Sequence, residues 1–144
     1  MPKITNNDVT LSDYRALAEF RYQLQRYFTL SDLAARSAGL HPGQYRFLLL
    51  LKGLPEGIEP TISNMAERLG LRHHSTVELV DRMEKRGLIY RERSERHRSF
   101  VFVRITPKGE GILKKLVASR KLELKKAGPI LVKVLNTLTK KRTR

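Results

Sequence analysis

The sequence predicts a mainly helical fold with one small β-hairpin (α+β), and three observations support this prediction. Apolar residues recur at helical spacing over most of the 144 residues. Two short helical patterns between Thr61 and Gly87 are separated by only a few residues, among them Gly70. Directly after Gly87, apolar and polar residues alternate with the period of two that is typical of strands. The chain is long enough to form one domain with a substantial core.

The first of the two short helices is expected from Thr61 to Gly70. Thr61 is a good N-cap, because its hydroxyl can accept a hydrogen bond from a free backbone N–H in the first turn. Gly70 can adopt the positive φ at which helices commonly end. A second helix begins about three residues later and is stopped by Gly87. This short spacing is the one that a helix-turn-helix requires.

The second helix has an inward and an outward face. The inward stripe is predicted to comprise Thr76, Leu79, Val80 and Met83. The outward side chains are His74, Ser75, Val77, Glu78, Asp81, Arg82 and Lys85. Such side chains can hydrogen-bond to base edges, touch a thymine methyl group and meet phosphates. The outward face is therefore the predicted DNA-reading surface.

A β-hairpin follows, with Leu88 to Arg93 as one strand and Phe100 to Ile105 as the other. The tip between them is short, polar and basic. An arginine-rich tip can lie along a phosphate backbone or enter a narrow minor groove. The alternative is a solvated turn that is basic only because the whole chain is basic. Together with the two helices, the hairpin predicts a winged helix-turn-helix.

Two helices are expected before this unit. A long one, capped by Ser12 or Asp13 and ended by Gly39, would span about 38 Å at 1.5 Å per residue. This is longer than a small core needs, which indicates that the helix also covers a second subunit. A central helix then opens at Pro42, which suits the first helical position.

Further helices are expected after the hairpin. Thr106 can cap a helix that opens at Pro107 and continues to about Ala127. Gly128-Pro129 is predicted to break it, because proline lacks an N–H and its ring clashes with the preceding turn. A last short helix follows, with Leu135 on its apolar side.

The charge of the chain is high and uneven. It carries 29 Lys and Arg against 14 Asp and Glu, a net charge of +15. Residues 1–67 hold 7 basic and 7 acidic side chains, whereas residues 68–144 hold 22 and 7. This excess favours a polyanionic partner, nucleic acid before membrane. No run of about 18 apolar residues and no signal pattern occurs, so a cytoplasmic protein without a membrane partner is expected.

Other chemistries find little support. The absence of cysteine excludes disulfides and thiolate metal ligands. The four histidines lack a ligand spacing with paired carboxylates, so no metal site is expected. No phosphate-cradling glycine loop, nucleophile motif or placed carboxylate pair occurs. The chain is therefore expected to be no enzyme, with no catalytic residues and no cofactor.

The chain resembles the MarR family of winged-helix transcriptional regulators. The segments that carry the resemblance are Leu40 to Leu48, Ala66 to Leu71, Leu79 to Ile89 and Val103 to Gly109. The resemblance implies a homodimer that binds a near-palindromic operator, with the second helix in the major groove and the wing beside the minor groove. It assigns residues 1–40 and 106–144 to a helical dimerisation region and residues 41–105 to the DNA-binding lobe.

The DNA-contacting face departs from the family pattern in two places. Arg72-His73-His74 stands where the family often has a small hydroxyl cap, and Glu78 stands where a basic or polar base-reader is common. The wing tip matches the family's Asp-Arg-Arg only in an ambiguous register, with Arg98 as the favoured anchor and Arg96 second. The predicted DNA-binding residues are Arg72, His73, His74, Ser75, Val77, Glu78, Arg82, Arg96, His97 and Arg98. Protonation of His73 or His74 would strengthen DNA binding at lower pH; packing at the helix start is an equal alternative for His73.

Three functions fit these features. The first is a sequence-specific transcriptional regulator, with repression favoured, that a small aromatic or phenolic effector could release from DNA. The effector pocket, whose residues are otherwise unknown, could be lined by Tyr14, Arg15, Tyr45 or Arg46, although an ordinary packing or surface role is the favoured interpretation of each. The second is an architectural, weakly sequence-specific DNA binder, which would show a steep salt dependence. The third is a module whose basic surface binds an acidic protein or RNA.

Overall fold

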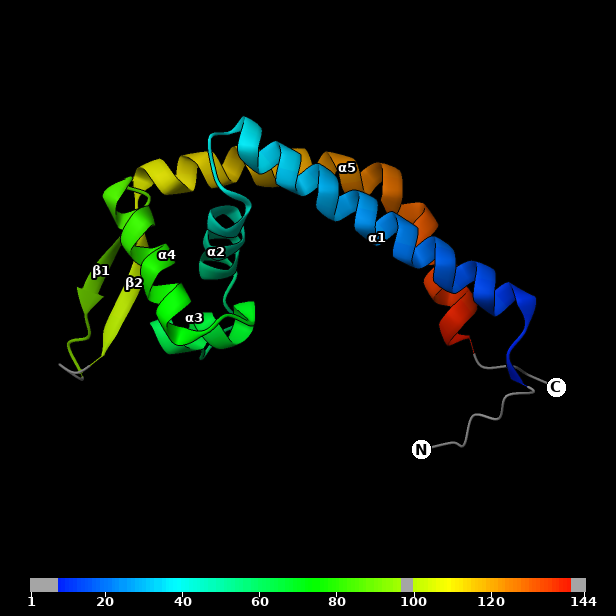
Figure 1. Cartoon of the computed structure of the whole chain (residues 1–144), viewed down its shortest axis with the longest axis horizontal. Coiled ribbons are helices and arrows are strands. Elements are labelled where there is room, and N and C mark those ends of the chain that lie inside the picture. The colour runs from blue at the N-terminus through cyan, green and yellow to red at the C-terminus, as the bar shows by residue number, and fades with distance from the viewer. Residues whose placement is uncertain (1–7, 97–99, 141–144) are drawn as a thin grey trace. The chain divides into compact units, whose positions relative to one another are not determined.

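The computed structural model describes residues 8–96 and 100–140. Five helices and one two-stranded antiparallel sheet are found in these ranges (Figure 1). In chain order they are α1 (Leu11–Ser37), α2 (Pro42–Lys52), α3 (Ile62–Leu69), α4 (His73–Lys85), β1 (Ile89–Arg93), β2 (Val101–Ile105) and α5 (Pro107–Thr139). The predicted fold class, mainly helical with a small hairpin, is confirmed.

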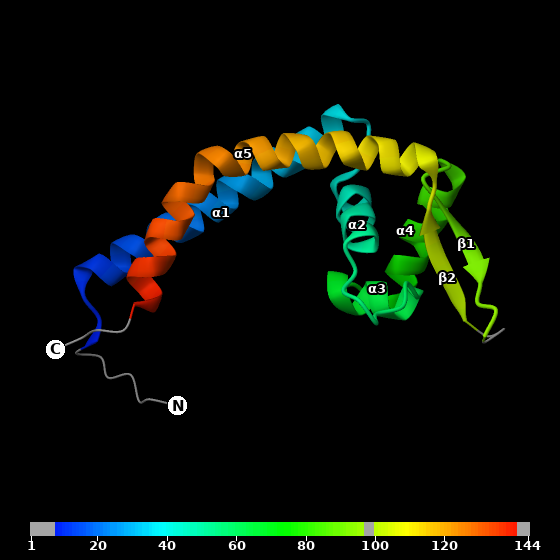
Figure 2. The ribbon, with the colours of Figure 1, turned by 180° about the vertical axis from the view of Figure 1, so that it is seen from behind.

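The chain forms two compact units. The winged unit spans Asp32–Ala118, and the helical unit is formed by Met1–Ser31 and Ser119–Arg144, as far as these are described. Helices α1 and α5 each belong to both units. Within the helical unit their segments run antiparallel and side by side (Figures 1 and 2).

The core of the winged unit is built around α2. Phe47 and Leu48 of this helix are completely buried, as are side chains from α3, α4 and the hairpin. These other side chains are Met65, Val80, Met83, Leu88 and Val103. Full burial of one such side chain contributes about 1.5–3 kcal/mol of hydrophobic stabilisation. This core holds α3, α4 and the hairpin together with α2, and Figure 2 shows the arrangement of these elements.

The caps of α3 are those that the sequence predicts. The Thr61 hydroxyl accepts a hydrogen bond from the backbone N–H of Asn64 at 3.1 Å. Gly70 ends the helix with a φ of 67°. Because a left-handed residue is nearly free of strain only when it is glycine, Gly70 allows the chain to turn directly into α4.

The cap of α1 differs from the expectation of Ser12 or Asp13. The Thr10 hydroxyl accepts from the Asp13 N–H at 3.3 Å, and the Asp13 carboxylate accepts from the Thr10 N–H at 2.9 Å. This reciprocal pair satisfies two backbone donors at once, which explains why the helix begins at Leu11 and not after Ser12 or Asp13. Gly39 follows the helix with a φ of 80°, in agreement with the predicted end.

The predicted break at Gly128-Pro129 is wrong. Helix α5 continues from Pro107 to Thr139 with Pro129 inside it. Pro129 removes only its own N–H from the hydrogen-bond ladder, whereas ending the helix would leave several backbone groups unpaired. The opening of α5 is as predicted, with the Thr106 hydroxyl accepting from the Gly109 N–H at 3.1 Å.

The hairpin is antiparallel and in the predicted strands. Its register runs from Ile89 opposite Ile105 to Arg93 opposite Val101. The segment before α3 joins β2, because the N–H of Val103 donates to the Pro60 carbonyl at 2.8 Å. The helix-turn-helix and the wing are thus connected through backbone hydrogen bonds.

Candidate nucleic-acid interface

Helix α4 is anchored by its inward face. Thr76, Val80 and Met83 are buried and Leu79 is half-buried, so the predicted inward stripe is confirmed. The buried Thr76 hydroxyl donates a hydrogen bond to the Arg72 carbonyl at 3.0 Å, so this polar group is not left without a partner in the core. The inward face therefore anchors the helix by packing, and the exposed side chains on the opposite face are available for contacts with a partner.

The outward face carries the predicted reading residues. Side chains at five of these positions are exposed, namely Arg72, His73, His74, Glu78 and Arg82. Ser75 and Val77 are half-buried. Arg72 is the N-cap residue with an extended backbone (φ −68°, ψ 151°), and no described side chain caps the first turn of α4. The backbone N–H groups of that turn consequently remain available to an acceptor such as a phosphate oxygen.

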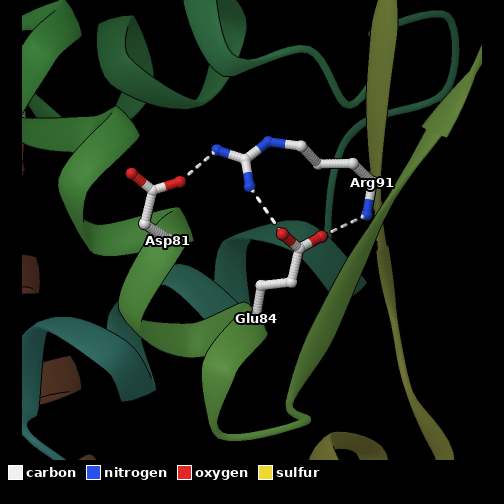
Figure 3. A network of polar contacts seen from close by, with 3 residues as sticks. All are labelled: Asp81, Glu84 and Arg91. Carbon is white, nitrogen blue, oxygen red and sulfur yellow. Dashed lines mark hydrogen bonds and ion pairs between the residues drawn. The ribbon is translucent and has the colours of Figure 1, made fainter.

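A polar network joins the wing to α4 (Figure 3). The Arg91 guanidinium of β1 donates to the Asp81 carboxylate at 2.6 Å and to the Glu84 carboxylate at 2.8 Å. The backbone N–H of Arg91 also donates to Glu84, at 3.0 Å. Sequence reasoning placed Asp81 on the outward face and missed its partner. The available signal was the i, i+3 spacing of the two acids together with the alternation of the strand.

The two acids act on the ionisation of Arg91. Partial burial by itself would lower its pKa, but the hydrogen bonds and charges of Asp81 and Glu84 outweigh this effect and raise the pKa above its ordinary value. Arg91 therefore stays charged at neutral pH. Its charged hydrogen bonds connect the wing to α4.

The outer surface of the hairpin carries a second ion pair. Nε of Arg104 donates to the Glu92 carboxylate at 3.1 Å, and its guanidinium carbon lies 5.4 Å from the ring centroid of Phe102. Both side chains of the ion pair are about half-exposed, so the pair contributes little to stability.

The wing tip is only partly described. Glu95 and Arg96 are exposed, and Ser94 before them is buried. His97 and Arg98, the latter the favoured wing anchor, lie outside the described residues. The structure thus brings seven of the predicted residues together on α4 and places Arg96 on the wing that is fixed to this helix by Arg91.

The residues suggested for an effector pocket have different environments. Tyr14 and Arg15 are exposed on the helical unit, and Tyr45 is buried in the core of the winged unit. Arg46 forms an exposed ion pair with Asp32 at 3.5 Å. In residues 8–96 and 100–140, no cluster of three or more His, Asp or Glu side chains could hold a metal ion. No helix in the same ranges is long and apolar enough to cross a membrane.

A capped short helix, a glycine turn, an anchored outer helix and an attached hairpin define a winged helix-turn-helix protein. Residues 38–98 match the model of the MarR family. A Bacillus subtilis (strain 168) protein named as an uncharacterized HTH-type transcriptional regulator, YfiV, is 35% identical over 66 residues, which are 46% of this chain and 41% of that protein. The chain thus matches about two-fifths of the length of this relative.

Several solved structures share the fold of this chain. AbsC, a MarR family transcriptional regulator from Streptomyces coelicolor, superposes with a TM-score of 0.68 at 18% identity and covers 97% of this chain and 94% of that one. A MepR mutant from S. aureus, bound to an oligodeoxyribonucleotide, gives 0.63 at 18% identity, with 83% and 95% covered. CouR from Rhodococcus jostii RHA1, bound to p-coumaroyl-CoA, gives 0.60 at 19% identity, with 83% and 89% covered. The resemblance of residues 38–98 to the MarR family is therefore confirmed, and YfiV and AbsC are named as transcriptional regulators.

Proposed function

We propose that the chain is a DNA-binding transcriptional regulator whose helix α4 lies in the major groove. The observation that carries the proposal is the division of this helix into a buried stripe and an outer face with exposed basic and polar side chains. Arg72, Arg82 and the first-turn N–H groups would contact phosphates, which fix register and orientation. His74 and Glu78 lie on the same face and would meet base edges.

The wing supplies the second contact in this proposal. Arg96 is exposed, and it precedes His97 and Arg98 in the sequence. The Arg91 network supports the proposal, because it fixes the base of the hairpin relative to α4. A wing held in this way would place its basic tip beside the minor groove whenever α4 occupies the neighbouring major groove.

A homodimer is proposed to present two such surfaces. The helical unit exposes large apolar side chains on both of its helices, including Leu17 on α1 and Leu122, Val132 and Leu135 on α5. A second copy would cover them, since isologous contacts between long helices bury apolar surface efficiently. Two-fold symmetry of the protein then implies a near-palindromic operator with half-sites about one helical turn apart.

Regulation by a small aromatic or phenolic effector, with repression as the favoured outcome, completes the proposal. It is supported by the relative that was solved with p-coumaroyl-CoA bound. Half-site spacing is fixed by geometry, so a rigid shift of a few Å between the two reading helices would mismatch both grooves at once.

The reading role of α4 is tested by fluorescence anisotropy with labelled duplex DNA over a range of salt concentrations. Arg82→Gln should weaken binding and reduce the slope of log affinity against log salt by about one. Lys125→Gln removes the same charge from an exposed position on α5 in the helical unit and should have a smaller effect. Equal losses in the two variants would show that α4 is not the reading element.

An architectural DNA-binding protein is the second candidate, and the net charge of +15 favours it. Such a protein would bind all duplexes with similar affinity, and this affinity would fall steeply with salt. A sequence-specific regulator would still prefer one DNA sequence at high salt, where the electrostatic attraction common to all duplexes is screened.

A further inference from the structure

The hairpin has a face that points away from α4. Arg91 of β1 points toward α4, as its side-chain bonds show (Figure 3). Because side chains alternate along a strand, its neighbours Tyr90 and Glu92 point to the opposite side. Their cross-strand partners on β2, Arg104 and Phe102, share this side. We refer to this side of the hairpin as the outer wing face.

The outer wing face presents aromatic side chains to solvent. Tyr90 and Phe100 are each 46% exposed, and Phe102 is half-buried. The Ser94 N–H donates to the Phe100 carbonyl at 2.9 Å, which extends the strand pairing by one residue and keeps Phe100 on the same side as Phe102. Aromatic rings carry a large apolar surface that proteins normally bury, so their exposure on one side of a hairpin indicates a contact surface.

Arg104 adds a flat positive group to the outer wing face. Its guanidinium carbon lies 5.4 Å from the centroid of the Phe102 ring, and its Nε donates to the Glu92 carboxylate at 3.1 Å. These contacts hold the guanidinium beside the rings while its side chain remains 44% exposed. Residues 89–105 hold five Arg against two Glu, so the surroundings are basic as well. Such a surface suits a ligand that combines flat apolar groups with negative charge.

We propose that the outer wing face binds single-stranded DNA by stacking of unpaired bases. Proteins hold unpaired strands by stacking successive bases on aromatic side chains within a basic surface. The bases of a duplex cover one another and present only their edges in the grooves, so duplex reading does not account for these rings. The excess of arginine favours a polyanion over an uncharged protein partner. The choice of DNA over RNA rests on the proposed function, which brings the wing to DNA.

The proposal is tested with the whole chain and a fluorescein-labelled oligothymidylate of about 12 nucleotides, which does not pair with itself. Anisotropy at near-physiological salt should show saturable binding. Tyr90→Leu keeps an apolar side chain but removes the flat ring, so it should weaken this binding at least about fivefold. Tyr90→Phe keeps the ring and should bind as the wild type does. Tyr22→Leu, at a position of α1 that is 56% exposed, is the matched control and should leave binding unchanged.

Two further readings separate stacking from attraction by charge. The chain has five Tyr and no Trp, so a base stacked on Tyr90 should quench tyrosine fluorescence. Tyr90→Phe should lose this part of the quenching while it keeps the affinity, and this variant decides if Tyr90→Leu does not fold. A duplex of the same length is titrated in parallel. Tyr90→Leu should bind the duplex normally, so that failure of the single-strand site is distinguishable from failure of the proposed function.

Several outcomes would overturn the proposal. An absence of saturable oligothymidylate binding is one, and an equal affinity of folded Tyr90→Leu and wild type is another. Undiminished quenching in Tyr90→Phe would mean that the bases lie elsewhere on the chain. Tighter binding of an oligouridylate of the same length would make RNA the ligand. If the wild type ignores the oligothymidylate while Tyr90→Leu weakens self-association, the outer wing face is a contact with a second copy of the chain.

Discussion

At the scale of single residues, Arg91 connects the two parts of the proposed DNA-binding surface. Its bonds to Asp81 and Glu84 are short, and its side chain is 27% exposed. Arg91→Gln should lower the free energy of unfolding by about 1 kcal/mol, since charged hydrogen bonds are lost at a partly solvated site. It should also weaken DNA binding, because the wing is no longer fixed to α4. Urea unfolding and fluorescence anisotropy measure the two effects.

The matched control for this variant is Arg93→Gln. Arg93 lies two residues further along β1, is exposed and carries the same charge. Any loss of affinity from the charge alone should be equal in both variants. If Arg93→Gln weakens DNA binding as much as Arg91→Gln does, the network has no positioning role.

Arg98 is the residue on which the wing contact depends in this account. Arg98→Ala should weaken operator binding by about 1–3 kcal/mol if the side chain reads a groove, with little change in thermal stability. Anisotropy at near-physiological salt and circular dichroism provide the two readings. An unchanged affinity would remove the wing tip from the mechanism.

At the scale of elements, Pro129 is the position at which local sequence rules fail. Proline in a helix interior costs about 3 kcal/mol relative to alanine. Pro129→Ala should therefore raise the midpoint of urea unfolding, because α5 already has helical geometry there. If the helix bends at Pro129, the gain in stability should be smaller than the full difference in helix propensity between proline and alanine. A lower midpoint would mean that a bend imposed by Pro129 is needed for packing.

Most elements could be predicted, because their signals are local. Thr61, Gly70 and Thr106 act on backbone groups within one turn, and the hairpin follows from a period of two. The two incorrect predictions, the cap of α1 and the break at Pro129, arise where local sequence signals compete with each other. Thr10 and Asp13 cap each other, so their pairing outweighs either residue alone, and the break expected at Pro129 ignores the helical turns on both sides.

The sequence predicted which residues belong to the candidate site, but not which side chains contact one another there. Helical periodicity separates the outer face of α4 from Thr76 and Val80. The contacts of Arg91 with Asp81 and Glu84 depend on how β1 packs against α4, which helical and strand periodicity alone do not specify. The contacts between the residues of a site can therefore be identified only once the fold is known.

At the scale of the whole molecule, the account depends on self-association through the helical unit. Leu135 is 42% exposed in the single chain. Leu135→Asp should yield monomer or aggregate, because the dimer would have to bury an unpaired charge. Sedimentation velocity measures the result, with Lys133→Asp as a control at an exposed polar position of α5. A stable dimer with the mass of the wild type would show that the dimer surface lies elsewhere.

The central claim, a dimer that reads a specific sequence, is tested most directly by selection from a pool of random duplexes at near-physiological salt, followed by sequencing of the bound DNA. A dimeric sequence-specific regulator should select a two-fold-symmetric motif whose half-sites are about one helical turn apart. Recovery of no motif, with an affinity that collapses as salt rises, would contradict the claim and identify an architectural DNA binder.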